Sequence, residues 1–241
     1  MRGEVEPVSV VPRYPAVAVM AKVPGATAVK SRLHPALGAV MATRLYECFL
    51  RDRLDALSAV ERIERVIAFT PFEAADEMAA LAPPGFRLAA QRGADLGARL
   101  DNLLTDLLAL GHPGAIAIDS DSPTLLMSYI SEAATVLAAN EADVVIGPCD
   151  DGGYYLIGLR TSHPELFAAI PWSTERVLPL TLERACRSGL RTHVLHSWFD
   201  VDTEADLVRL QRDIARHRGA RPLRTTALVH ELLATGALGD S

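Results

Sequence analysis

The sequence is short of lysine and cysteine, and each shortage excludes a class of protein. The chain has 24 Lys and Arg residues, but Lys22 and Lys30 are its only lysines, and the formal net charge is −6. An acidic chain lacks the basic face that a nucleic-acid-binding protein needs. The three cysteines form no C-x-x-C pair, which argues against a disulfide framework and against a thiolate zinc site. We therefore expect free thiols and no nucleic-acid partner.

Long apolar runs are also absent. No stretch approaches the length of a membrane span, and the N-terminal segment has Glu4 and Glu6 where a signal peptide would have a basic start. The hydrophobic content of 49% and the charged content of 22% are typical of a globular chain. These features predict a cytoplasmic protein without a membrane span.

Short apolar runs alternate with longer segments of helical periodicity. This alternation predicts a three-layer α/β/α domain with a mostly parallel central sheet. We expect a flexible leader at 1–14, a single domain at 15–218 and a C-terminal extension at 219–241, which is a short helix or a loose tail. The expected strands are 16–20, 66–69, 86–90, 115–118, 144–146, 154–159 and 192–195, and the expected helices are 35–57, 96–110, 125–139, 175–187 and 204–217.

Basic residues directly follow the first predicted strand. Ligands of open parallel sheets bind beyond the carboxyl ends of the strands, and Lys22, Lys30 and Arg32 lie at such an end. A lysine ammonium reaches a phosphate as a compact charge, so these residues are candidates for phosphate binding. The alternative is that the lysines are solvated surface charges. The segment contains no G-x-x-x-x-G-K-[ST] motif, because Val29 stands at the second glycine position.

Pairs of carboxylates follow two other predicted strands. Asp119 and Asp121 belong to "DSDSP", and Asp200 and Asp202 belong to "FDVDT". Helix capping would explain one acid at each place but not the second. Four carboxylates at two strand ends would repel one another unless a cation lay between them. We therefore predict that these four residues bind a divalent metal, Mg²⁺ or Mn²⁺.

Two glycine-containing segments complete the candidate site. The "DDGGY" segment is either a plain hairpin turn or a surface where a ligand lies against backbone and a carboxylate accepts sugar hydroxyls. The "GADLGARL" segment is either the ordinary start of a helix or a nucleotide-binding loop. The candidate residues in these segments are Asp95, Arg99, Asp151, Gly152, Gly153 and Tyr154.

Together these segments resemble the radical-SAM/selenodomain-associated transferase family, which implies a GT-A-like, nucleotide-diphospho-sugar transferase fold. A more distant resemblance extends to 2-phospholactate guanylyltransferases and molybdenum-cofactor nucleotidyltransferases. The family more often has Pro-Gly where Ala26-Thr27 stands, and it tends to have a small residue in place of Asp119. The resemblance covers about residues 15 to 212 and rests on "AKVP", "VKSRL", "GADLGARL", "DSDSPTL", "GPCDDGGYYLIGL", "PWSTERVLPLT" and "FDVDTEADL".

The resemblance also implies a divalent metal, a nucleotide-bearing donor and roles for the matched residues. The D-G-G-Y and D-x-D-T segments are its most specific parts. The implied roles are phosphate binding for Lys22, Lys30 and Arg32, metal binding for Asp121 and Asp202, and second-substrate binding for Asp151, Gly152, Gly153 and Tyr154.

We therefore expect a metal-dependent transferase with a nucleotide-activated donor and a small-molecule acceptor. Mg²⁺ or Mn²⁺ on Asp121 and Asp202 would bridge the donor phosphates, and Asp151 or Asp150 would orient or deprotonate an acceptor hydroxyl. Usage in the resembling family favours sugar transfer from a nucleotide sugar. The alternatives are nucleotidyl transfer from an NTP to a phosphorylated acceptor, for which Arg99 is a candidate contact, and a non-catalytic nucleotide-binding domain. The sequence leaves the oligomeric state open.

Overall fold

The structure is a computed structural model that describes residues 12–216 and 221–234. The described residues leave out 1–11 of the predicted leader and His217, at the end of the last predicted core helix. They also leave out 219–220 and 235–241 of the predicted C-terminal extension. None of the helices in the described part of the chain combines the length and the apolar character that crossing a bilayer requires.

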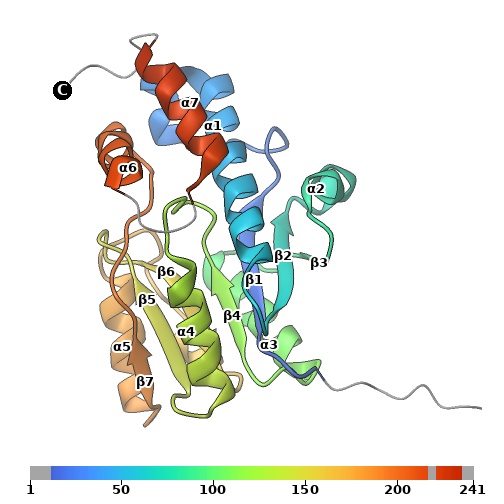
Figure 1. The fold of residues 1–241 in the computed structure, drawn as a ribbon. Coiled ribbons are helices and arrows are strands. Elements are labelled where there is room, and N and C mark those ends of the chain that lie inside the picture. The colour runs from blue at the N-terminus through green and yellow to red at the C-terminus, as the bar shows by residue number, and fades with distance from the viewer. Residues whose placement is uncertain (1–11, 217–220, 235–241) are drawn as a thin grey trace, which may run out of the picture.

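The described residues form a seven-stranded sheet in the order β3-β2-β1-β4-β6-β5-β7 (Figure 1). Strand β6 is antiparallel to both of its neighbours, and the other pairs are parallel. The central strands are continuous apolar runs because helices cover both faces of the sheet. The strands are β1 (Ala16–Lys22), β2 (Glu64–Thr70), β3 (Phe86–Ala90), β4 (Ala115–Ile118), β5 (Val144–Pro148), β6 (Tyr154–Leu159) and β7 (Thr192–Val194).

The helices are arranged around the sheet in three groups (Figure 1). The second half of α1 packs with α4 on one face of the sheet, and α3 packs with α5 on the other. The first half of α1 forms a separate apolar cluster with α6 and α7. The helices are α1 (His34–Ser58), α2 (Ala75–Leu81), α3 (Leu96–Ala109), α4 (Met127–Ala138), α5 (Val177–Arg187), α6 (Glu204–Arg216) and α7 (Leu223–Ala234), with short 3-10 turns η1 (Ser31–Leu33), η2 (Phe72–Ala74) and η3 (Pro164–Leu166).

The three-layer α/β fold with a mostly parallel sheet confirms the prediction from the sequence. Every predicted strand and helix is present, with ends within two residues of those expected wherever the structure describes them. Two features were not predicted. Helix α1 is interrupted at Gly38, whose φ of 76° and ψ of 158° are not helical, and α2 is a helix of seven residues, too short for its periodicity to be recognised.

Helix α7 is held against α1 by both polar and apolar contacts. Asp52 of α1 accepts a hydrogen bond from the backbone N–H of Thr225 at 2.8 Å, which satisfies a free donor in the first turn of α7. Leu228 and Val229 are buried in the cluster that α7 shares with α1 and α6. The C-terminal segment therefore contributes a packed helix to the fold.

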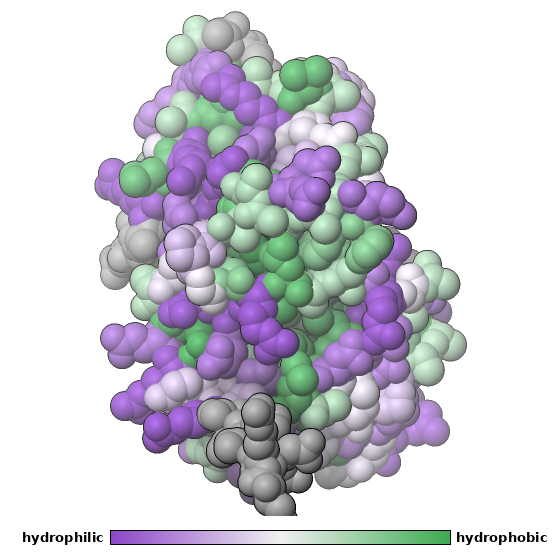
Figure 2. All heavy atoms as spheres, turned by 90° about the vertical axis from the view of Figure 1, so that its right-hand side faces the viewer, coloured by the Kyte–Doolittle hydropathy of each residue, from purple (hydrophilic) through white to green (hydrophobic). Residues whose placement is uncertain are grey.

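Strand β3 forms one edge of the sheet and is incompletely covered. Figure 2 shows the side of the molecule that carries α2 and β3, where hydrophobic residues gather in a central band between hydrophilic ones. Phe72 is 70% exposed and Leu88 of β3 is 37% exposed. Arg87 on the same strand is exposed as well, and a charged side chain on an edge strand discourages pairing with another chain.

The amino ends of β5 and β7 are joined by a network around Arg191. Its guanidinium donates to Asp143 at 2.8 and 3.0 Å and to the backbone oxygen of Asn140 at 2.7 Å. Hydrogen bonds from the Arg191 side chain and backbone hold the pKa of Asp143 at about 2, below the usual value of about 3.9. The charged form of Asp143 therefore stabilises the folded chain.

We expect Asp143→Asn to lower the free energy of unfolding at neutral pH and to matter less as the pH falls. The folded-state pKa is depressed, so the stabilisation by Asp143 is complete above about pH 4 and is lost as the pH falls towards about 2. Urea unfolding of both proteins from pH 6 to the lowest pH at which they fold measures this difference. A difference that stays constant across that range would contradict the assignment.

Candidate functional site

The predicted acidic residues come together beyond the carboxyl ends of the strands. The backbone N–H of Val201 donates to the backbone oxygen of Asp121 at 3.0 Å, and the backbone N–H of Asp150 donates to the backbone oxygen of Trp198 at 3.0 Å. These bonds hold the segment after β7 against both the loop after β4 and the turn after β5. We call the resulting group the carboxylate cluster, and it consists of Asp119, Asp121, Asp151, Asp200 and Asp202.

The ammonium of Lys30 lies between two members of the carboxylate cluster. Its Nζ is 2.9 Å from Oδ1 of Asp121 and 2.9 Å from Oδ1 of Asp202, and its side chain is 3% exposed. Burial alone would lower the pKa of Lys30, but the two carboxylates raise it above its usual value. Lys30 is therefore charged at neutral pH and bridges the two carboxylates that the sequence predicted as metal ligands.

The backbone of Lys30 adopts a conformation that is uncommon for a residue with a side chain. Its φ of 49° and ψ of 42° lie in the left-handed region, which non-glycine residues occupy at a cost when surrounding contacts hold them there. In this case the ion pairs with Asp121 and Asp202 supply those contacts. The geometry directs the side chain inward, and it excludes the interpretation of Lys30 as a solvated surface charge.

Lys22 and Arg32 lie beside the carboxylate cluster but remain exposed. In the described residues the Lys22 ammonium has no ion-pair partner, while its backbone N–H donates to Oη of Tyr46 at 2.9 Å. Arg32 is 66% exposed, and its Nη1 is 3.6 Å from Oδ2 of Asp202. These two side chains are therefore accessible to an anionic ligand from solvent, and their role in phosphate binding stays a prediction.

Asp119 is held by a buried arginine that the sequence analysis did not single out. Arg53 of α1 is 1% exposed, and its Nη2 is 3.4 Å from Oδ1 of Asp119 and also donates to the backbone oxygen of Ser122. Burial raises the pKa of Asp119 to about 6, against the opposing effect of Arg53. The available signal was a charged residue on the apolar face of a predicted helix, between Leu50 and Leu54.

The two acids of the turn after β5 have different partners. Asp150 pairs with Arg209 of α6 at 2.7 Å, and the Arg209 guanidinium lies 4.0 Å from the ring centre of Phe199. Asp151 is exposed and accepts a hydrogen bond from the N–H of Gly153 at 2.8 Å. Asp151 is therefore the member of the pair that remains available to a substrate.

Gly152 of this turn is required by its backbone conformation and by close packing. Gly152 has φ of +88°, and a Cβ at that position would lie 2.5 Å from the backbone of Glu175. Tyr154 is half-buried and packs edge-on against Trp172, with ring centres 6.4 Å apart. Segment 171–176 thus lies against the turn, next to the predicted second-substrate residues.

Asp95 and Arg99 have local structural contacts in the same region. Oδ1 of Asp95 accepts a hydrogen bond from the N–H of Ala98 at 2.8 Å and caps α3, while Nε of Arg99 donates to the oxygen of Gly93 at 3.2 Å. No ion pair or hydrogen bond joins Asp95 or Arg99 to the carboxylate cluster in the described part of the chain. Their role in nucleotide binding stays a prediction.

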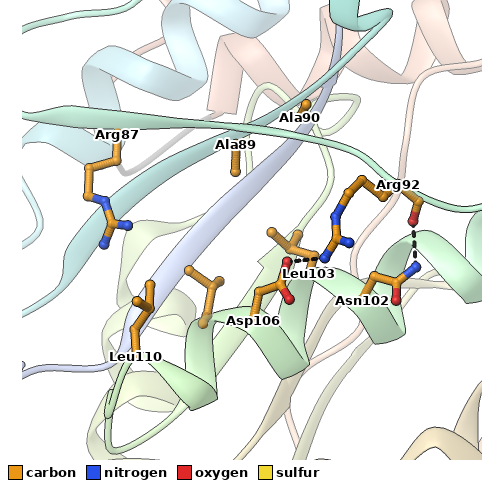
Figure 3. Close-up of a pocket in the computed structure, with 9 residues that line it drawn as sticks. Arg87, Ala89, Ala90, Arg92, Asn102, Leu103, Asp106 and Leu110 are labelled. Carbon is orange, nitrogen blue, oxygen red and sulfur yellow. Dashed lines mark hydrogen bonds and ion pairs between the residues drawn. The ribbon is translucent and has the colours of Figure 1, made fainter.

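A hollow of about 210 Å³ between β3 and α3 shares no residue with the carboxylate cluster (Figure 3). Three of its four polar side chains are joined to one another, whereas Arg87 has no ion pair or hydrogen bond within the part of the chain that the structure describes. Arg92 pairs with Asp106 at 2.5 Å, and the side-chain amide of Asn102 donates to the backbone oxygen of Arg92 at 2.8 Å. The one acid of the hollow, Asp106, is already paired with Arg92, so the hollow has no group of free carboxylates comparable to the carboxylate cluster.

The donors of the carboxylate cluster fit a hard divalent cation. Lys30 is bonded to Oδ1 of both Asp121 and Asp202. Oδ2 of each is a possible ligand, and Oδ2 of Asp202 has the exposed Arg32 as a more distant neighbour at 3.6 Å. Burial and the neighbouring acids, Asp202 first, raise the pKa of Asp200 to about 7. Burial is the largest cause of this rise, and the neighbouring carboxylates add negative charge of the kind that a bound cation would offset.

Comparison with known proteins places the chain among nucleotide-dependent transferase folds. The family described as "Uncharacterized protein conserved in bacteria (DUF2064)" matches residues 53–174. A protein from Desulfovibrio desulfuricans G20, provisionally described as a nucleotide-diphospho-sugar transferase, is 31% identical with a TM-score of 0.82, and the match covers 91% of this chain and 95% of that one. A search of the curated proteins gives no match.

More distant structures share the fold alone. A cytidylyltransferase from Leptospira borgpetersenii is 14% identical with a TM-score of 0.55, over 95% of this chain and 98% of that one. A CMP:2-keto-3-deoxy-manno-octonic acid synthetase, solved with CTP, is 12% identical with a TM-score of 0.55, over 84% and 99%. The match to the Desulfovibrio protein supports the GT-A-like superfamily. None of these matches names the radical-SAM association that the sequence resemblance implied.

We expect Lys30→Met to lower the free energy of unfolding by about 3 kcal/mol, because removing one partner of a buried ion pair leaves the other uncompensated. Urea unfolding measures the change. The matched control is Lys22→Met, in which the exposed lysine is expected to change stability by less than about 0.5 kcal/mol. Equal effects of the two substitutions would show that Lys30 is not an internal counter-charge.

Proposed function

The chain belongs to the bacterial DUF2064 family, and we propose that it is a transferase that uses a nucleotide-activated donor. The observation that carries the proposal is the carboxylate cluster with Lys30 inside it and with Lys22 and Arg32 exposed beside it. Acids that bind a cation, next to basic groups that face solvent, suit the phosphates of a nucleotide. The likeness to the Desulfovibrio protein supports the same class.

Different residues of the site would contact the donor and the acceptor. Lys22 and Arg32 would bind the donor phosphates and oppose the negative charge that develops as the phosphate leaves. Asp121 and Asp202 would hold Mg²⁺ or Mn²⁺ through the oxygens that Lys30 does not use, and such a cation neutralises phosphate charge when bound. Asp151 would orient an acceptor hydroxyl and accept its proton.

The group transferred is, in the first candidate, a sugar that passes from a nucleotide sugar to a small acceptor. The second candidate is nucleotidyl transfer from an NTP to a phosphorylated small molecule. The exposed cations Lys22 and Arg32 favour the second candidate, because a triphosphate carries more negative charge than the diphosphate of a nucleotide sugar. Both reactions suit this fold, so the fold does not choose between them.

A ligand panel tests the proposal directly. Thermal unfolding is measured with nucleoside diphosphates, triphosphates and nucleotide sugars, each with and without Mg²⁺ or Mn²⁺. A ligand at about a hundredfold its dissociation constant adds roughly 2.7 kcal/mol, which raises Tm by roughly 5 to 10 °C for a chain of this size. For sugar transfer, the first candidate, we expect a metal-dependent rise in Tm with a nucleotide sugar for the wild type and its loss in Asp121→Asn.

Asp76→Asn is the matched control, because Asp76 is an exposed acid on α2 outside the carboxylate cluster. It should respond as the wild type does. A rise with triphosphates alone would select nucleotidyl transfer, and tight binding without turnover of any donor would select a non-catalytic domain. If no ligand shifts Tm, the proposed nucleotide site is wrong.

A further inference from the structure

Cys149 has no role in the proposed transfer, yet its thiol lies against two members of the carboxylate cluster. Its Sγ and one carboxylate oxygen each of Asp151 and Asp200 all lie within 4.8 Å of one another. Cys149 is 8% exposed, and no hydrogen bond to its sulfur is present among the residues that the structure describes. A nearly buried thiol without a partner therefore points at two carboxylates.

Backbone hydrogen bonds fix the positions of these three donors. The N–H of Cys149 donates to the oxygen of Gly153 at 3.0 Å, which closes the turn that carries Asp151. The backbone N–H of Trp198 donates to the backbone oxygen of Pro148 at 2.9 Å, and Trp198 and Cys149 form an isolated parallel β-bridge. The segment leading to Asp200 is thereby held in register with the turn, so the donors converge before any ligand binds.

The distribution of cations leaves the same two carboxylates unbalanced. Lys30 pairs with Asp121 and Asp202. Two arginines pair with neighbouring acids: Arg53 contacts Asp119, and Arg209 contacts Asp150. Within 12–216 and 221–234, neither Asp151 nor Asp200 has an ion pair with Lys, Arg or His. Two close acids without a counter-charge favour the binding of a cation between them.

We propose that Cys149, Asp151 and Asp200 form a second divalent-cation site, which takes a thiolate-accepting ion such as Zn²⁺ or Co²⁺ in preference to Mg²⁺. A thiolate ligand selects softer ions, whereas Mg²⁺ takes oxygen ligands almost entirely. Binding replaces the thiol proton, which passes to solvent. One thiolate and two carboxylates leave a fourth position of a tetrahedral ion open to water or substrate. The sequence predicts no thiolate zinc site because it has no C-x-x-C pair, whereas this donor set combines one thiolate with two carboxylates that lie far apart in the sequence.

The site deepens the proposed function, because it includes the acceptor residue Asp151, but it does not depend on which group is transferred. A cation at Cys149, Asp151 and Asp200 would carry its open position on the acceptor side of the carboxylate cluster. Asp121 and Asp202 would remain the ligands of the donor-side cation. The two sites are therefore separable by substitution.

Cobalt absorption tests the proposal without any turnover assay. In a Cys48→Ser/Cys186→Ser background Cys149 is the one thiol of the chain, and the full-length protein is titrated with Co²⁺ at pH 7.5. We expect one equivalent of Co²⁺ to give thiolate-to-cobalt charge-transfer absorption that excess Mg²⁺ does not remove. Further substitution Cys149→Ser should abolish the absorption, and Asp200→Asn should weaken Co²⁺ binding by at least about tenfold.

Two controls separate this site from the donor site. Asp121→Asn should keep the cobalt absorption while losing the nucleotide-dependent rise in Tm, and Asp76→Asn should keep both. Cys149→Ala, which retains a small apolar side chain, is the second variant if Cys149→Ser does not fold. Absence of thiolate absorption in the Cys48→Ser/Cys186→Ser protein, or its removal by Mg²⁺, would overturn the proposal. Thiolate absorption in a protein that binds no nucleotide would sustain this site and reject the proposed function.

Discussion

The ion pair of Lys30 with Asp121 and Asp202 is the constraint on which the arrangement of the site depends. Three loops meet there, since Lys30 follows β1, Asp121 follows β4 and Asp202 follows β7. Without a cation between them the two carboxylates would repel each other, and the loops that carry them would separate. The protein therefore assembles its acidic site by placing a permanent positive charge inside it. The cost of burying that charge is offset because both partners are close and oriented.

Helix α1 connects the site to the sheet and to the other helices. Its second half packs on the sheet and carries Arg53 to the loop of Asp119, while the neighbouring Asp52 faces the other way and caps α7. Its first half belongs to the apolar cluster of α6 and α7. Helix α6 in turn carries Arg209 to Asp150. The apolar cluster of α1, α6 and α7 and the functional site thus stabilise each other. The links are charged side chains on α1 and α6, which also pack in that cluster.

The sequence was sufficient to predict the elements of the fold, because buried strands and amphipathic helices have distinct periodicities. It also predicted which strand ends carry acids. It could not predict the partners of those acids. Lys30 meets Asp202 across 172 positions of sequence, and Arg53 meets Asp119 across 66. Such contacts depend on the order of the strands in the sheet and on the left-handed backbone conformation of Lys30. Neither feature produces a recognisable pattern in the nearby sequence. The capping role of Asp95 was open to prediction, because N-capping depends on the three residues that follow.

The scarcity of lysine follows from the different tasks of the two basic residues. Where this chain joins elements it uses arginine, whose planar fork can bond several oxygens at once, as Arg191 does with Asp143 and Asn140. Between Asp121 and Asp202 the geometry is different, since a single point charge must lie 2.9 Å from oxygens of two separate carboxylates. An ammonium meets that requirement and a flat guanidinium does so less well. Lys22, exposed beside the same acids, has the compact charge that suits a phosphate oxygen. Lys30 therefore occurs where one small positive charge must face oxygens that belong to different groups.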